Sequence, residues 1–417
     1  MTGKKIIGFF KNKLHIWTFA LTVFFTINMN YDWRTVHIVW YGCLAFLVFS
    51  YMITFQGKFL FSNSPFLTWI CSFLLLCVCS FLWCLSLSTG LDVVKSLVVI
   101  IAVLLLVQSS INYGFKLETV LRGYFVSTLI NAIYIVVNID MTKLGITQIG
   151  VELINGWNGN GIGFMMAQGA LIGCYLLHKC QTLRSKIVYL VSVVAFSLLT
   201  VYTGSRTAFI VLVVELVLYF WMRYPTKIMR NIVILLIAFF VAVILIMNVE
   251  GFYNVLGSRL EDLFEVLSGS GEGDGSSNIR LEFIRNGIEW FAEKPVLGYG
   301  INNYKVLNES ATGNFTYAHN NFVEIAVNLG VIGLILYYSV YVHIIRKMLR
   351  SVKNNPRCAF LFSAIVATLL SHYGTVSYYD FYENLLILMC FIEISKGRKG
   401  VIESDEWNDK KNCVDVV

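Results

Sequence analysis

Three short stretches of the chain combine Arg or His with other polar side chains. Two of them lie at the ends of long apolar runs, and the third opens an amphipathic segment. The first is YTGSRTAF, residues 202–209, in which Arg206 opens an apolar run beside Ser205. Arginine binds phosphate oxygens through paired hydrogen bonds, and unpaired N–H groups at a helix N-terminus also favour an anion. The alternative is an arginine that only extends from a helix end into water. We interpret the stretch as a candidate phosphate site.

The second stretch is AHNNFVEIAVNLGVIG, residues 318–333, in which His319 precedes a run of apolar residues. Asn320, Glu324 and Asn328 follow at intervals of four, so they share one face of a helix. Polar side chains in a span should face protein or a watery cavity, which predicts a water-filled cleft. A histidine near its ordinary pKa can accept a proton at neutral pH, although a hydrogen-bonded interface residue is the alternative. Glu324 could orient His319 or pair with an arginine.

The third stretch is NIRLEFIRNGIEWFAEKPVLGYGINNY, in which Arg280 opens an amphipathic segment. Arg280 is a second candidate phosphate ligand, and the alternative for Arg280 or Arg285 is pairing with nearby acids. Tyr299 and Asn302 could bind sugar or cap the loop. No Asp pair or His/Cys set has the spacing of metal ligands, so we predict no metal and no cofactor. Supporting candidates around these stretches are Ser205, Arg259, Tyr299, Asn302, Asn320 and Glu324.

These stretches must be held by an integral membrane protein. The 417 residues are 57% hydrophobic and 14% charged, with a mean hydropathy of +0.70, whereas soluble domains have about 25% charged residues. The four prolines fall between apolar runs, which predicts uninterrupted helices. We expect an all-α polytopic fold of about twelve spans in a single domain, residues 1–417. The spans are predicted at roughly 14–30, 36–55, 66–88, 93–111, 119–138, 161–178, 187–203, 206–222, 231–248, 318–345, 358–377 and 381–395.

The distribution of charge orients these spans. With both termini in the cytoplasm, most of the 32 Lys and Arg residues fall in cytoplasmic segments, as the positive-inside rule requires. The formal charge of +7 therefore indicates sidedness and not nucleic-acid binding. Residues 249–317 form a large external loop between spans nine and ten, with five basic against ten acidic residues and helical patterns at about 253–267 and 279–293.

The order and spacing of the three stretches resemble those of the O-antigen ligase and O-antigen or capsular polysaccharide polymerase (Wzy-like) superfamily. The resemblance is strong over about residues 200–345. It implies a fold related to C-type glycosyltransferases and a glycan donor carried on undecaprenyl diphosphate. It also implies that Arg206 and Arg280 hold the diphosphate and that His319 acts on the acceptor hydroxyl. The site would then lie on the outer face of a bacterial cytoplasmic membrane.

Three functions remain open after this reasoning. A polymerase extends a carrier-linked repeat, and we prefer this interpretation. An O-antigen ligase would transfer the finished polymer to lipid A core or another terminal acceptor. A lipid-linked oligosaccharide flippase would need a route through the bundle, usually with repeats and broken helices, and no catalytic base. Expected partners are the glycan donor and acceptor, membrane lipid, and a flippase and chain-length regulator of the same pathway, with no nucleic acid.

Overall fold

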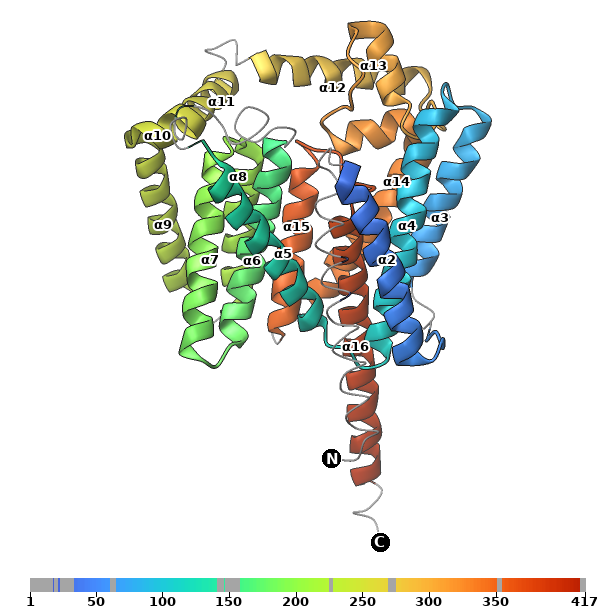
Figure 1. Ribbon diagram of the computed structural model, residues 1–417, viewed down its shortest axis with the longest axis vertical. Helices are drawn as coiled ribbons and strands as arrows, with labels where there is room; N and C mark the ends of the chain where they lie inside the picture. Colours follow the sequence, from blue (N-terminus) through green and yellow to red (C-terminus); the bar gives the residue numbers. More distant parts are fainter. Residues whose placement is uncertain are drawn as a thin grey trace.

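A bundle of long helices forms most of the chain (Figure 1). The computed structural model describes residues 34–60, 65–140, 158–224, 228–268, 275–350 and 355–412, together with residues 18, 22 and 146. All the regular elements within these residues are helical. The bundle helices are α2 (Arg34–Phe55), α3 (Pro65–Cys79), α4 (Leu87–Asn112), α5 (Leu117–Asn138), α6 (Gly159–Lys179), α7 (Leu183–Tyr202), α8 (Arg206–Arg223), α9 (Ile228–Asn248), α14 (Asn321–Leu349), α15 (Pro356–Ser371) and α16 (Phe381–Asn412).

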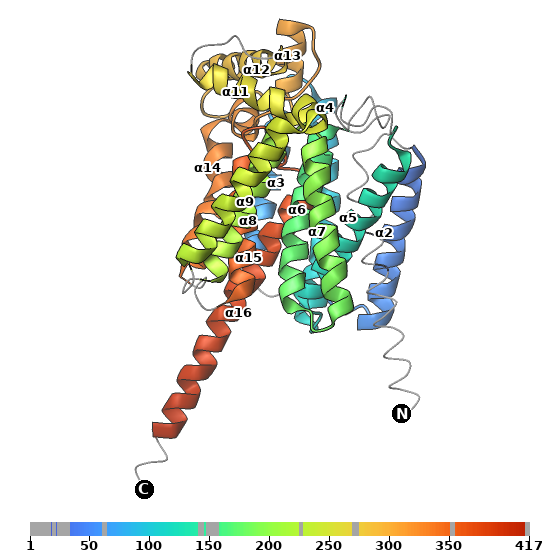
Figure 2. The same ribbon diagram turned by 90° about the vertical axis from the view of Figure 1, so that its left-hand side faces the viewer.

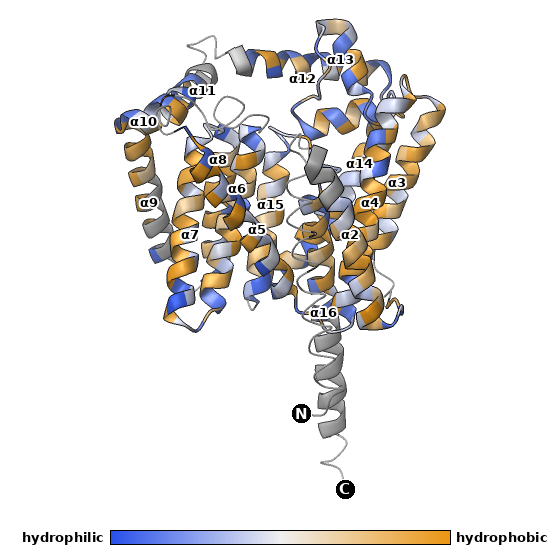
Figure 3. Cartoon of the chain, viewed as in Figure 1, coloured by the Kyte–Doolittle hydropathy of each residue, from blue (hydrophilic) through white to orange (hydrophobic). Residues whose placement is uncertain are grey.

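The chain is a multi-pass membrane protein. Among the described residues, six helices are long and apolar enough to cross a membrane, and a bent pair makes a seventh. Eleven of the predicted spans coincide with helices, whereas the first, at 14–30, lies almost wholly outside the described residues. The total of about twelve spans therefore stays a prediction. Figure 3 shows apolar residues along the bundle and polar residues toward its two ends.

Shorter helices lie across one end of the bundle (Figures 1 and 2). They are α10 (Glu250–Phe252), the π-helical turn η3 (Tyr253–Gly257), α11 (Ser258–Ser268), α12 (Gly275–Glu293) and α13 (Tyr304–Thr312). The two helical patterns expected in this region are confirmed by η3–α11 and α12, whereas α13 was not predicted. The chain bends by 94° between α9 and α10–α11. Phe209, Ile246 and Leu256 form a buried apolar cluster at this bend, which fixes α11 against α8.

The prediction of uninterrupted helices is wrong for α14. Gly330 has φ 64° and ψ −164°, which breaks the helix within its apolar stretch. The KPVLGYG segment, residues 294–300, inserts at the break and bonds to the freed backbone groups. Val331 N–H donates to the Pro295 carbonyl at 2.8 Å, and Tyr299 N–H donates to the Val327 carbonyl at 2.9 Å. The loop thus satisfies polar groups that would otherwise be buried without partners.

Candidate active site

The turn between α7 and α8 presents Arg206 at the start of α8. Gly204 has φ 63°, a left-handed conformation that suits glycine in a tight turn. The Ser205 hydroxyl accepts a hydrogen bond from Ala208 N–H at 3.2 Å, so Ser205 is the N-cap of α8. Ser205 thus supports the candidate site by shaping the start of α8. The Arg206 side chain is half-buried.

Arg259, at the start of α11, is joined to this turn by two reciprocal contacts. Its Nη1 donates to the Gly204 carbonyl at 2.8 Å, and Arg206 Nη1 donates to the Arg259 carbonyl at 3.1 Å. The bend after α9 thus brings two guanidinium groups from sequence-distant segments to one place. Two like charges held together favour a bound anion.

His319 lies just before α14, among aromatic rings. Its φ of 52° is unusual for a residue other than glycine. The Tyr317 ring centroid lies 4.2 Å from the imidazole centroid, and the ring of Phe283 on α12 is stacked with the imidazole at a centroid distance of 6.2 Å. The Nδ1 atom is buried and has no hydrogen-bond partner within the described part of the chain. A backbone conformation of this kind, together with an unsatisfied buried nitrogen, is typical of functional sites.

Arg280 of α12 reaches the same place. Burial and, to a smaller extent, the Arg280 charge lower the pKa of His319 to about 4. Arg280 also acts on Tyr317, whose pKa is raised by burial and lowered in part by this guanidinium. Arg280 is therefore close enough for its charge to act on both the His319 imidazole and the Tyr317 hydroxyl. The assumption of an ordinary histidine pKa is wrong, because burial beside the rings of Tyr317 and Phe283 desolvates the imidazole.

Arg285, by contrast, pairs with Glu289 on the exposed face of α12, with Nε and Oε1 separated by 3.3 Å. The alternative of pairing with a loop acid thus holds for Arg285.

The polar face of α14 is closed and not exposed to a cleft. Asn320, Glu324 and Asn328 are 6%, 1% and 0% exposed. Asn320 caps α14 by accepting Phe322 N–H at 3.0 Å. Glu324 accepts Ala318 N–H at 2.8 Å, directly before His319. Asn328 donates to Glu324 at 3.2 Å. The prediction of a water-filled cleft along this face is therefore wrong, because all three side chains are buried and bonded within the protein. They instead fix the backbone that carries His319.

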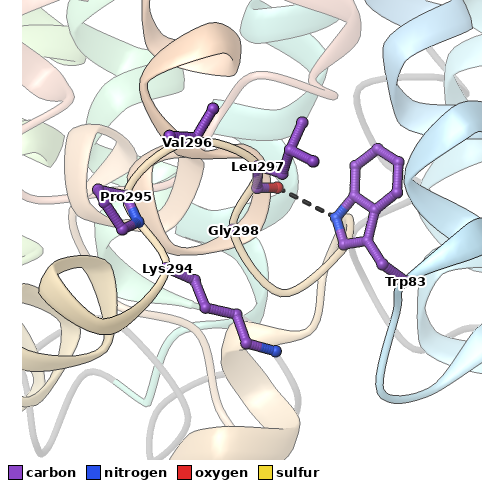
Figure 4. A pocket seen from close by; sticks show the side chains of 6 residues that line it. All are labelled: Trp83, Lys294, Pro295, Val296, Leu297 and Gly298. Atoms are coloured by element: carbon purple, nitrogen blue, oxygen red, sulfur yellow. Dashed lines mark hydrogen bonds between the residues drawn. The ribbon is translucent and has the colours of Figure 1, made fainter.

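Tyr299 and Asn302 hold the inserted loop. The Tyr299 hydroxyl donates to Glu293 at 2.5 Å, and the Asn302 amide donates to the Thr89 carbonyl at 2.7 Å. Trp83 adds a bond from its ring N–H to the Leu297 carbonyl at 3.1 Å, beside a pocket of about 280 Å³ (Figure 4). These contacts favour the loop-capping alternative over sugar binding.

A connection that the sequence analysis did not single out, residues 372–380 between α15 and α16, links the Arg206 turn to the His319 segment. A Cβ on Gly374 would lie 2.6 Å from the Thr207 hydroxyl, so this loop packs directly on the start of α8. The Asn321 side chain accepts Ser377 N–H at 3.0 Å on the other side. Asp380 ends the loop, and burial raises its pKa to about 8. A carboxyl in a short connection carries no motif, so only the fold reveals it.

This arrangement defines a membrane-embedded helical protein with arginines and one neutral histidine gathered at one end. Residues 162–338 match the family model described as O-antigen ligase. The match spans α6 to the first part of α14, including Arg206, Arg280 and His319, and it confirms the resemblance to the O-antigen ligase/Wzy-like superfamily. No curated protein sequence matches the chain.

Proposed function

We propose that the protein polymerises oligosaccharide repeat units carried on undecaprenyl diphosphate, by inverting, metal-independent glycosyl transfer. The observation that carries this proposal is the buried His319 imidazole with an unpartnered Nδ1 in the described part of the chain, on which the Arg280 charge acts, within the segment that matches the O-antigen ligase family. A cation beside a neutral base suits a reaction in which an anionic group leaves while a hydroxyl loses its proton.

In the proposed step, an acceptor hydroxyl oxygen attacks the anomeric carbon of the donor glycan. The bond from that carbon to the diphosphate oxygen breaks, and the electron pair stays on the carrier diphosphate. Arg280 and Arg206 stabilise the developing charge, with Arg259 beside Arg206. The hydroxyl proton passes to His319, whose pKa of about 4 leaves the imidazole unprotonated at pH 7. Attack from the side opposite the diphosphate inverts the anomeric carbon.

The distribution of charged residues supports a site on the external face of the cytoplasmic membrane. α6 begins near the site and ends at His178 and Lys179, and α14 likewise ends at Arg346 and Lys347. The basic ends of both helices therefore lie opposite the α10–α13 layer. By the positive-inside rule this basic end is cytoplasmic, so the site and the acidic segment 249–317 face outward.

The ligase alternative has one observation in its favour, which is that residues 162–338 match the O-antigen ligase family. Both reactions use the same donor, and they differ only in the acceptor. In a deletion strain, accumulated single repeats on the carrier support a polymerase, whereas accumulated long polymer on the carrier supports a ligase. A flippase would consume no donor, so release of carrier diphosphate by the purified protein separates both enzymes from a transporter.

The central test replaces the three proposed site residues one at a time in a complemented deletion strain. Arg206→Ala, Arg280→Ala and His319→Ala should each abolish glycan extension while the protein remains in the membrane. Arg285→Ala is the matched control, because this arginine lies on the same helix as Arg280 but pairs with an exposed acid. Near-normal polymer from all three site variants would refute the proposed mechanism.

A further inference from the structure

A buried polar network joins α14, α15 and α16 next to the site. At its centre, the His372 Nε2 lies 3.1 Å from Glu383 Oε2. His372 and Glu383 are 0% and 2% exposed. The hydroxyls of Tyr337 and Tyr341 on α14 both donate to the other Glu383 oxygen. The carboxylate thus has three donors, two from α14 and one from His372 at the end of α15.

One branch of this network leads toward the site. The Tyr338 hydroxyl lies 3.2 Å from His372 Nδ1, and it accepts a hydrogen bond from the Asn321 amide at 3.0 Å. Because Glu383 accepts from Nε2, the imidazole proton is on that nitrogen, and Nδ1 is free to accept from Tyr338. All the bonds then run in one consistent direction, from Asn321 and Tyr338 through His372 to Glu383.

Asn321 is the point where this network meets the site, two residues after His319. Its backbone N–H donates to the His372 carbonyl at 2.8 Å. Its side-chain oxygen accepts the N–H groups of Ser377 and Tyr378 at 3.0 and 3.2 Å. The loop held by these bonds also packs on Thr207, next to Arg206. Asn321 therefore ties the segment of the proposed base to the loop that touches the proposed phosphate-binding turn.

We infer that His372 and Glu383 are positioning residues for glycan transfer, which act through Tyr338 and Asn321 to hold His319 in register with the Arg206 turn. The inference rests on the proposed function. Apolar side chains could pack three helices with equal or greater stability than a buried carboxylate and its polar partners. Directional hydrogen bonds to the Asn321 side chain fix the orientation of the backbone beside His319, which apolar packing would not do.

The test compares two tyrosines that each contribute one hydroxyl to the network. Tyr338→Phe removes the hydroxyl that joins His372 to Asn321. Tyr341→Phe removes a hydroxyl that donates to Glu383 and has no hydrogen bond to Asn321. We expect kcat to fall about tenfold in Tyr338→Phe, with the donor KM changed less than about twofold, because misplacement of a reacting group affects the chemical step. Tyr341→Phe should keep kcat within about twofold of the parent.

Both variants are measured as purified protein with carrier-linked glycan extracted from the deletion strain, together with their thermal midpoints. Equal losses of kcat in the two variants, or full kcat in Tyr338→Phe, would overturn the inference, because a purely structural network would not distinguish them. His319→Ala is included in the same assay. If it is inactive while Tyr338→Phe matches Tyr341→Phe, only the positioning inference fails; full activity of His319→Ala would refute the proposed function itself.

Discussion

Substitution of Gly330 by alanine should detach the inserted 294–300 segment from α14 and stop glycan extension. The φ of 64° and ψ of −164° lie in a region that is essentially restricted to glycine. In addition, a Cβ at this position would lie 2.1 Å from the Val296 carbonyl oxygen. Backbone atoms cannot rotate away as a side chain would, so the segment must withdraw.

The cost follows from what withdrawal breaks. Three backbone hydrogen bonds anchor the segment, and each contributes about 1 kcal/mol net. The backbone strain of a non-glycine residue adds about 1–3 kcal/mol. We therefore expect the free energy of unfolding to fall by about 4–6 kcal/mol, well above the effect of most single substitutions. The bonds are Val331 N–H to Pro295 at 2.8 Å, Tyr299 N–H to Val327 at 2.9 Å and Gly300 N–H to Asn328 at 2.8 Å.

Activity should be lost as well, because the segment follows α12 directly. Without its anchor, α12 no longer fixes Arg280 beside His319, and misplacement of such a group by about 1 Å can cost a hundredfold in rate. The assays are thermal unfolding of the purified protein in detergent and polymer formation in the complemented strain.

Gly313→Ala is the matched control, because Gly313 also has positive φ, 75°, but nothing lies within 4 Å of an added Cβ. Its free energy of unfolding should fall only by the cost of a left-handed backbone conformation, about 1–2 kcal/mol, and polymer synthesis should be retained. Equal midpoint shifts for the two variants, or normal polymer from Gly330→Ala, would refute the account of the inserted loop.

Two further predictions concern the electrostatics of the site. The pH profile of kcat/KM, which reports the free enzyme, should fall on its acid limb with an apparent pKa of about 4, because His319 must be neutral to act as the base and its pKa is about 4. Arg280→Gln should raise the apparent pKa of this acid limb, measured on the residual activity, because it removes a charge that disfavours imidazolium. The apparent pKa should stay below the ordinary value of about 6.5, since burial is the larger cause. An apparent pKa of about 6.5 in the parent would contradict the buried imidazole. Arg259→Ala should raise the donor KM about tenfold, because Arg259 supports the Arg206 turn and adds a cation, whereas Arg285→Ala should leave KM unchanged; equal KM values in both would place Arg259 outside the site.

Local pattern was sufficient to predict most of the helices, and it supplied Arg206, Arg280 and His319 as candidate site residues. Apolar runs predict spans because hydrocarbon requires them, and α11 and α12 follow from helical periodicity in the segment 249–317. The break at Gly330 is different, since LGVIG reads as ordinary span sequence. Only the approach of Pro295 and Val296 from another segment makes that glycine necessary, and local sequence does not contain this contact.

The polar residues of α14 illustrate the same limit at the site. Their spacing of four correctly predicts a shared helix face, but it does not say what that face meets. Glu324 accepts hydrogen bonds from Ala318 N–H and Asn328, so its carboxyl group shapes the segment before His319. The alternatives of orienting the imidazole directly or pairing with an arginine are not what the contacts show. A buried carboxyl group can thus position the proposed base through the backbone alone.

The proximity of Arg280 and His319 has a consequence for the order of events under the proposed function. In the free protein the guanidinium helps to keep the imidazole a weak base. A diphosphate bound by Arg280 brings negative charge to the same place and offsets that effect, so the pKa of His319 rises when the donor is present. The base therefore becomes competent at the moment when there is a leaving group to displace. Since burial by Phe283 and Tyr317 remains after the donor binds, the imidazole still loses its proton readily once transfer is complete, and the site returns to its neutral state for the next repeat.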